Sequence, residues 1–244
     1  MNVSEAIIER IRQINAGYQH LELAVDEPLQ KIKPGQTLLV RQTESWHPYL
    51  REHWWTVGVR EKRLIVERPL DEHYTPSQVI NVLGIVGQPY RFRRSLRNVM
   101  LIAHDTAPTP LMMNIPWLLG NNISVTLVLT GEGTRYPTTH LDERVEIIHG
   151  EPDFTWQDQV MTIGWADQIF VVVNPYDEIS HFKEIVERIT DLRTIIPKNY
   201  LFGVFRPEFA CGAGACNACM IRTQQGTSLV CMEGPAYDLT QLIL

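Results

Sequence analysis

The first 210 residues of this 244-residue chain contain no cysteine. A disulfide framework or a thiolate metal site is therefore excluded from most of the sequence. Positive charge is also scarce, because 22 Lys and Arg stand against 28 Asp and Glu, a formal net charge of −6. This balance gives no support for non-specific binding to nucleic acid, so we expect no nucleic-acid partner.

A long uninterrupted apolar run is missing too. The stretch 106–131 carries no charged residue, but Pro108, Pro110 and Pro116 interrupt it. A lipid-spanning helix tolerates such breaks poorly, and we expect no membrane insertion. The first residues, MNVSEAIIERIRQ, carry charges where a secretory leader needs its apolar segment. This predicts a cytoplasmic protein.

The four cysteines follow one another as Cys211-x4-Cys216-x2-Cys219-x11-Cys231. This is the plant-type ligand spacing of a [2Fe-2S] cluster, which points to single-electron chemistry. A bridged di-iron cluster needs four thiolates close together. Three come from one tight loop here, and we expect a returning strand to deliver Cys231 as the fourth metal ligand.

Gly212 and Gly214 suit this cluster loop, since glycine allows positive φ and a close approach of backbone amides to the cluster sulfurs. Two other interpretations are open. Structural zinc also takes four thiolates, but usually in two separated C-x2-C pairs. Two disulfides are the remaining alternative, which an intracellular location disfavours.

Residues 1–97 alternate short β-type runs with turn signals and show no long amphipathic helix. This pattern predicts an antiparallel β-barrel domain. Its candidate strands are 6–13, 18–25, 37–41, 54–59, 64–68 and 79–83.

Residues 98–206 instead alternate apolar runs with helical patterns. Such runs are typical of buried parallel strands, so we predict a doubly wound α/β domain with a parallel sheet. The candidate strands are 99–103, 125–129, 145–148, 169–173 and 201–205. Ile179, Phe182, Val186 and Ile189 are expected to form the buried face of a helix. Residues 207–244 complete the chain as a small [2Fe-2S] lobe.

Two segments of the last lobe carry a family resemblance. They are EFACGAGAC at 208–216 and VCMEGP at 230–235, joined by a KPGQ at 33–36 and a GIVG at 84–87. The chain resembles the electron-transfer subunit of the two-component dihydroorotate dehydrogenase, a branch of the ferredoxin reductase-like flavoproteins. The resemblance implies electron flow from NADH to FAD, then through the cluster to a partner oxidoreductase subunit in a hetero-oligomer.

The flavin motif of that family is Arg-x-aromatic-Ser/Thr, and this chain has His53, Trp54, Trp55 and Thr56. The resemblance implies that His53, Trp55 and Thr56 bind FAD. A histidine lacks the fork and full charge of arginine, however, and the segment 56–84 lacks the expected phosphate-binding Gly-Thr-x-Ser. The opposing interpretation is that the aromatic residues are ordinary barrel packing.

The family's glycine-rich phosphate turn is replaced by AHDTAPTP at 103–110, and its Cys-Gly-Pro by Val173-Asn174-Pro175. Productive NAD(P) binding is therefore disfavoured, because close backbone approach needs glycine and Asp105 adds negative charge. Asp105, Thr106 or Thr109 is expected to cap the following helix. His104 is interpreted as a packed histidine and not as a proton shuttle.

Four arginines, Arg91, Arg93, Arg94 and Arg97, lie in the linker between the two domains. They either face water or dock a phosphate or an acidic partner.

The sequence leads to three functional hypotheses. The first is an electron-transfer subunit with a [2Fe-2S] cluster, with or without an FAD, that serves a partner oxidoreductase and contains no catalytic acid or base of its own. The second is a degenerate scaffold subunit that holds only the cluster. The third is a complete NAD(P)H-dependent flavin reductase.

Overall fold

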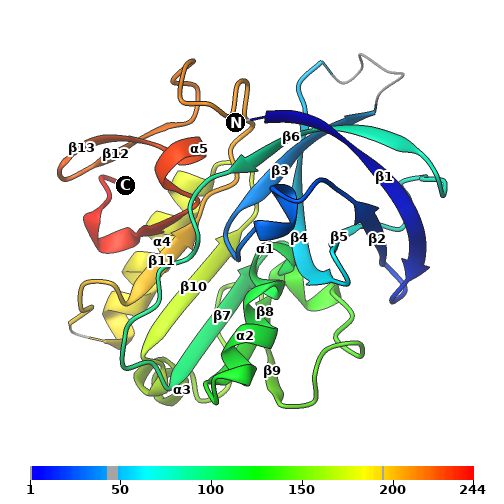
Figure 1. The fold of residues 1–244 in the computed structure, drawn as a ribbon. Coiled ribbons are helices and arrows are strands. Elements are labelled where there is room, and N and C mark those ends of the chain that lie inside the picture. Colours follow the sequence, from blue (N-terminus) through cyan, green and yellow to red (C-terminus); the bar gives the residue numbers. More distant parts are fainter. Residues whose placement is uncertain (1, 43–48, 194) are drawn as a thin grey trace.

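Alternating apolar residues close the N-terminal strands into a barrel. The structure, a computed structural model, describes residues 2–42, 49–193 and 195–244. In strand β2 every second residue is buried, so Leu21 and Leu23 point into the barrel while their neighbours face outward. The barrel order is β1-β2-β5-β4-β3-β6 (Figure 1). Its elements are β1 Asn2–Gln13, β2 Tyr18–Ala24, η1 Leu29–Lys31, β3 Thr37–Gln42, β4 Glu52–Arg60, β5 Arg63–Pro69 and β6 Val79–Val86. The predicted antiparallel barrel is confirmed, with β1 and β4 beginning earlier than the sequence indicated.

A mixed six-stranded sheet follows the barrel, in the order β14-β11-β10-β7-β8-β9. The five strands from β7 to β11 are parallel, and β10 is buried along its whole length. This confirms the predicted doubly wound α/β architecture. The elements are β7 Asn98–His104, α1 Thr109–Met112, α2 Asn114–Gly120, β8 Ser124–Thr130, η2 Gly131–Arg135, β9 Val145–His149, α3 Gln159–Trp165, β10 Gln168–Val173, α4 Glu178–Leu192 and β11 Leu201–Val204.

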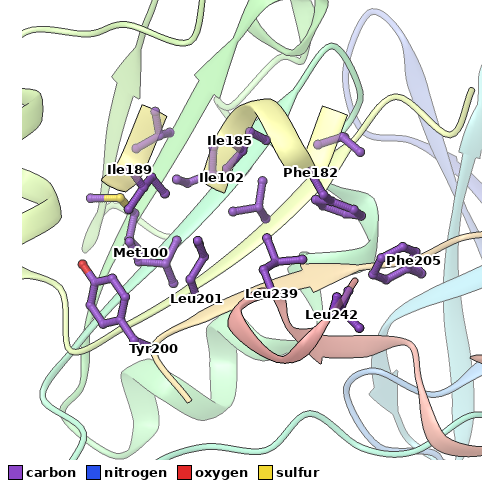
Figure 2. Packing of buried hydrophobic residues seen from close by; sticks show 14 of the residues in the cluster. Met100, Ile102, Phe182, Ile185, Ile189, Tyr200, Leu201, Phe205, Leu239 and Leu242 are labelled. Carbon is purple, nitrogen blue, oxygen red and sulfur yellow. The ribbon is translucent and has the colours of Figure 1, made fainter. Parts of the chain in front are cut away.

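Each face of the sheet has its own apolar core. Met100 and Ile102 of β7 pack with α3 and α4 on one face, and Leu101 packs with α1 and α2 on the other. Figure 2 shows Phe182 and Ile185 of α4 within the first of these cores. Successive residues of β7 therefore point to opposite faces of the sheet, and helices cover both faces.

The buried face of α4 differs from the predicted one. Phe182 and Ile189 are fully buried as expected, but the third buried position is Ile185, whereas Ile179 is 40% exposed and Val186 is partly buried. The helix begins only at Glu178, so Ile179 lies in its first turn, beyond the edge of the sheet core.

The C-terminal lobe is tied to the sheet by a strand that the sequence did not reveal. It contains β12 Met220–Thr223, β13 Gly226–Leu229, α5 Val230–Glu233, β14 Ala236–Asp238 and η3 Leu239–Gln241. Strand β14 pairs antiparallel with β11, with Phe202 opposite Asp238. Three residues of mixed polarity give no recognisable β pattern, and only the exposed edge of β11 makes them a strand. Among the described residues, no helix has the length and apolar composition needed to cross a bilayer.

The α4 correction can be tested with two matched substitutions. We expect Ile185→Ala to lower the free energy of unfolding by about 2–5 kcal/mol, because it removes a side chain that is 98% buried. Ile179→Ala, the same change in the same helix, is expected to cost about 0.5 kcal/mol or less. Urea unfolding of both variants measures the difference, and equal losses would contradict the observed face.

Candidate iron-sulfur site and its junction with the barrel

The four cysteine thiols meet as two pairs. Cys211 lies beside Cys216, whose thiol helps to lower the pKa of Cys211, and Cys231 lies beside Cys219, whose thiol helps to raise the pKa of Cys231. Cys219 and Cys231 are buried, Cys211 is half-buried and Cys216 is exposed. Within residues 2–42, 49–193 and 195–244, no group of three or more His, Cys, Asp or Glu side chains is arranged to hold one metal ion. Two thiol pairs side by side are what a bridged di-iron cluster requires.

Backbone amides surround these sulfurs. The amide of Ala213 donates to Cys211 Sγ at 3.4 Å, and together with neighbouring amides it lowers the pKa of that thiol to about 6. The amide of Cys231 donates to Cys219 Sγ, also at 3.4 Å. Amides that face sulfur stabilise its negative charge, so this loop is suited to thiolate ligands.

Glycine is required at the turn of this loop. Gly212 and Gly214 have φ of 64° and 74°, as the sequence prediction requires. A Cβ on Gly214 would lie 2.9 Å from Met232 Cγ, so the position is also too crowded for a side chain. The two glycines therefore set the path that lets the amides approach the sulfurs.

The sequence predicted that a returning strand would deliver the fourth thiol, and this prediction is wrong. Cys231 lies in α5, two residues after the end of β13. The short helix buries the thiol, and this burial raises the pKa of Cys231 to about 11. A metal bound there would favour the thiolate and offset that cost.

The end of the barrel holds the lobe in place. The amide of Gly87 donates to Cys231 O at 3.0 Å, and Gln88 Nε2 donates to Met232 O at 2.8 Å. A Cβ on Gly87 would lie 3.0 Å from Gly234 O, and its φ is 82°. Gln88 was missed by sequence reasoning. Gly87 was noticed only as part of the barrel-end motif, which does not show what it contacts.

A buried ion pair with Glu178 holds Arg206 in place. Arg206 is the first residue of the segment 206–210 that leads into the cysteine loop, which we call the stem. Arg206 donates its backbone amide to both carboxylate oxygens of Glu178, at 2.9 and 3.0 Å, and its guanidinium bonds to Val173 O and Thr106. Burial raises the pKa of Glu178 to about 7, against the lowering effect of these bonds and of the Arg206 charge. Neither residue was predicted, because a single Arg and a single Glu give no sequence signal.

His53, Trp55 and Thr56 do lie together beside this junction, but in a closed arrangement. Both ring nitrogens of His53 are out of contact with solvent and have no hydrogen-bond partner among the residues that the structure describes. The ring packs against Trp55 and Phe209, with centroids 4.9 and 4.8 Å apart. Burial lowers the pKa of His53 to about 3, so the ring is uncharged at neutral pH and cannot replace the arginine of a pyrophosphate site.

The surroundings of Trp55 leave little room for a flavin ring. Trp55 is 7% exposed and belongs to the same core as Leu111 of α1, which lies against β4. Thr56 Oγ1 donates to Met113 Sδ at 3.1 Å. The cavity left here measures about 300 Å³, at the lower end of small-molecule sites. These residues as placed do not fit FAD held in the manner that the resemblance implies, and their flavin role stays a prediction.

Two arginines of the barrel that could replace the missing arginine of the flavin motif are already engaged. Arg68 donates to Glu72 and Glu52 at 2.8 Å and stacks over Trp54. Arg51 donates to the backbone and side chain of Asn81. Each guanidinium would have to leave a bidentate or paired site to reach a pyrophosphate.

The prediction that a side chain caps the helix after β7, at the carboxyl edge of the sheet, is wrong. The N-cap residue of α1 is Pro108, and no side chain caps the helix. Asp105 instead accepts the amide of Glu132 at 2.9 Å, and Thr109 donates to Glu67. These side chains turn away from the helix because η2 and the barrel offer donors and acceptors that the sequence does not place nearby.

His104 and the linker arginines lie in the kind of surroundings that the sequence indicated for them. His104 is 7% exposed, shares a hydrogen bond with Thr130 at 2.9 Å and lies edge-on to Phe154. It is a packed histidine. The linker arginines all face solvent, and Arg93 also donates to Asp167 O.

Known proteins resemble the chain in two ways. Residues 207–243 match the family described as the iron-sulfur cluster binding domain of dihydroorotate dehydrogenase B. No curated protein is a significant sequence match.

Solved structures share the overall fold. An NADH-dependent reduced ferredoxin-NADP oxidoreductase from a study of flavin-based electron bifurcation superposes with a TM-score of 0.72, covering 97% of this chain and 89% of that one at 13% identity. The ferredoxin reductase in carbazole 1,9a-dioxygenase gives 0.59, with 86% and 70% covered at 14% identity. The ferredoxin-NADP+ reductase from Plasmodium falciparum gives 0.52, with 81% and 91% covered at 12% identity. The ferredoxin reductase-like fold and the cluster-domain resemblance are thus both confirmed.

Gly214→Ala tests the cluster loop. We expect it to lose most bound iron and acid-labile sulfide, because an alanine at φ 74° is strained and its Cβ meets Met232. Gly164→Ala is the control, since a Cβ there meets nothing within 4 Å. Iron and sulfide assays on both proteins decide, and full occupancy in Gly214→Ala would contradict this account of the loop.

The raised pKa of Glu178 makes stability depend on pH. The native state binds a proton between the unfolded pKa of 4.5 and the folded value of about 7, so the free energy of unfolding contributed by Glu178 falls as pH rises through that window. Glu178→Gln is expected to remove this fall, while Glu187→Gln on the exposed side of α4 keeps it. Urea unfolding at several pH values measures it, and parallel curves for wild type and Glu178→Gln would refute the assignment.

Proposed function

Because the C-terminal segment matches a cluster-binding domain on a ferredoxin reductase-like fold, we propose that this chain is an electron-transfer subunit carrying one [2Fe-2S] cluster. The observation that supports the proposal most is that the four thiols lie as two neighbouring pairs, with backbone amides directed at their sulfurs. Cys211 and Cys216 would hold one iron, and Cys219 and Cys231 the other. When bound, the cluster supplies reversible one-electron chemistry.

The chain's own contribution is to position and insulate that cluster. Ala213 and its neighbours direct amides at Cys211, which favours the charged form of the ligands. The buried pair Cys219 and Cys231 lies against the end of the barrel, whereas Cys216 is exposed. One side of the site is therefore shielded from water and the other is open.

The open side supports a partner oxidoreductase in a hetero-oligomer. Met220 and Met232 flank the cysteine loop and are 51% and 45% exposed. Methionine is enriched at protein interfaces, where its flexible side chain adapts to a partner. We propose that electrons enter or leave the cluster across this side, and that the partner carries out the chemistry on the substrate.

Two versions of this function differ in FAD. The buried and uncharged His53, the covered Trp55 and the engaged arginines support the version in which the cluster is the redox group and the barrel is structural. At the carboxyl edge of the sheet, the Asp105 carboxylate accepts the Glu132 amide and adds negative charge to the turn where the family receives the dinucleotide phosphates. This supports a subunit that does not itself accept hydride from NAD(P)H.

Anaerobic purification followed by metal, sulfide and flavin assays on one sample tests the proposal. We expect about two irons and two acid-labile sulfides per chain, with flavin near zero. Zinc without sulfide would overturn the cluster assignment, and flavin near one per chain that NADH bleaches would establish the reductase alternative.

Substitution of one ligand supplies a second readout. Cys216→Ser is expected to lose the visible absorption of the cluster with little loss of fold, because that side chain is exposed. Circular dichroism checks the fold, and Thr223→Ser in the same lobe is the control. An unchanged spectrum in Cys216→Ser would remove this residue from the ligand set.

A further inference from the structure

A second cavity lies between the barrel and α2, away from the cysteine loop. Its volume is about 310 Å³, and its walls include Val57 of β4 with Ile115 and Leu119 of α2. His20, Glu67 and His140 line it from the barrel and from the segment before β9. The cavity is thus apolar along its walls and polar at one end, which is typical of a site for a small organic molecule.

Glu67 dominates the polar end. Its side chain is 1% exposed, and it accepts hydrogen bonds from Thr109 Oγ1 at 2.5 Å and from Tyr136 OH at 2.7 Å. Both donors are neutral hydroxyls. An ionised carboxylate has about four acceptor positions, so this group keeps acceptor capacity.

Among the residues that the structure describes, no lysine or arginine forms an ion pair with this buried carboxyl group. Its only ion-pair partner in the described part of the chain is His20, whose Nε2 lies 3.6 Å from Oε2, beyond hydrogen-bond length. The adjacent Arg68 is held by Glu52 and Glu72. A buried carboxylate is costly unless it is paired, so the polar end of the cavity favours a cation.

The other polar groups of the cavity do not change that preference. Burial lowers the pKa of His140, which leaves a neutral imidazole whose Nε2 is 3.2 Å from Tyr136 OH. Arg144, at another part of the lining, is paired with Asp142 at 2.9 and 2.7 Å. Among its lining residues in the described part of the chain, the cavity therefore offers no unpaired lysine or arginine that would attract a carboxylate or a phosphate.

We propose that this cavity binds a small primary amine with an apolar body, whose ammonium group donates to Glu67 between the two histidines. The alkyl or aryl body packs against Ile115 and Leu119, which are 5% and 8% exposed. At about 310 Å³ the cavity suits a single ring or a short chain and is too small for a dinucleotide. The proposal does not depend on the proposed electron-transfer function.

Benzylamine and benzoate are the probes, because they share a ring and differ in the sign of the charged group. Isothermal titration on the full chain with its cluster is expected to give saturable benzylamine binding with a dissociation constant below about 1 mM, and none for benzoate. Benzylamine that fails to bind, or benzoate that binds as tightly, would overturn the proposal.

Two variants locate the binding. Glu67→Gln is expected to weaken benzylamine at least about tenfold, because it removes the charge and keeps an acceptor oxygen. Gly120→Leu is expected to abolish binding, since Gly120 lines the cavity and a Cβ there meets no atom within 4 Å. Gly164→Leu, equally open at its Cβ but in α3, is the control and should bind normally.

Each outcome of the variant and displacement experiments either supports or contradicts the proposed amine site. If Glu67→Gln does not fold, Gly120→Leu still reports on the cavity, and unchanged binding in Gly120→Leu would refute it. Displacement of benzylamine by FAD or AMP would also refute it, because the space would then belong to a nucleotide site. Iron and sulfide contents of the variants are expected to match wild type, which separates failure here from failure of the cluster assignment.

Discussion

The buried contact between Arg206 and Glu178 is the constraint on which the cluster site depends. It lies where β11 ends and the stem of the cysteine loop begins, and it joins α4, β10 and the segment after β7 to that one residue. Burying both charges is unfavourable on its own, but the one amide of Arg206 donates to both carboxylate oxygens and its guanidinium donates to Val173 O and Thr106, which offsets part of this cost. The stem therefore leaves the sheet in one direction, towards the barrel end that holds Cys231 O.

The packing beside that junction also fills space between the barrel and the sheet. Phe209 packs against His53, and α1 lies against β4. At the carboxyl edge of the strands, Asp105 accepts the amide of Glu132. Phe209 precedes the first cysteine by two residues, so its packing also positions the start of the cysteine loop.

Parts of the fold were predictable because they depend on local pattern. The period-two alternation of β2 and the apolar run of β10 directly indicate a barrel strand and a buried parallel strand. Helix α4 was predicted with one face misassigned, because Ile179 and Ile185 are equally apolar and only the position of the sheet decides which is buried. Strand β14 had no pattern at all, and its pairing with β11 made it a strand.

The ligand set was predictable from the sequence alone, since thiolate spacing in one loop is a property of a short segment and needs no distant partner. The positive φ of Gly212 and Gly214 followed in the same way. Three features became visible only in the folded chain: His53 is buried and uncharged, Asp105 binds Glu132 and not its own helix, and Glu67 faces a cavity. Each of these depends on which distant segment supplies the neighbouring donor, acceptor or apolar surface, and a linear sequence does not specify that.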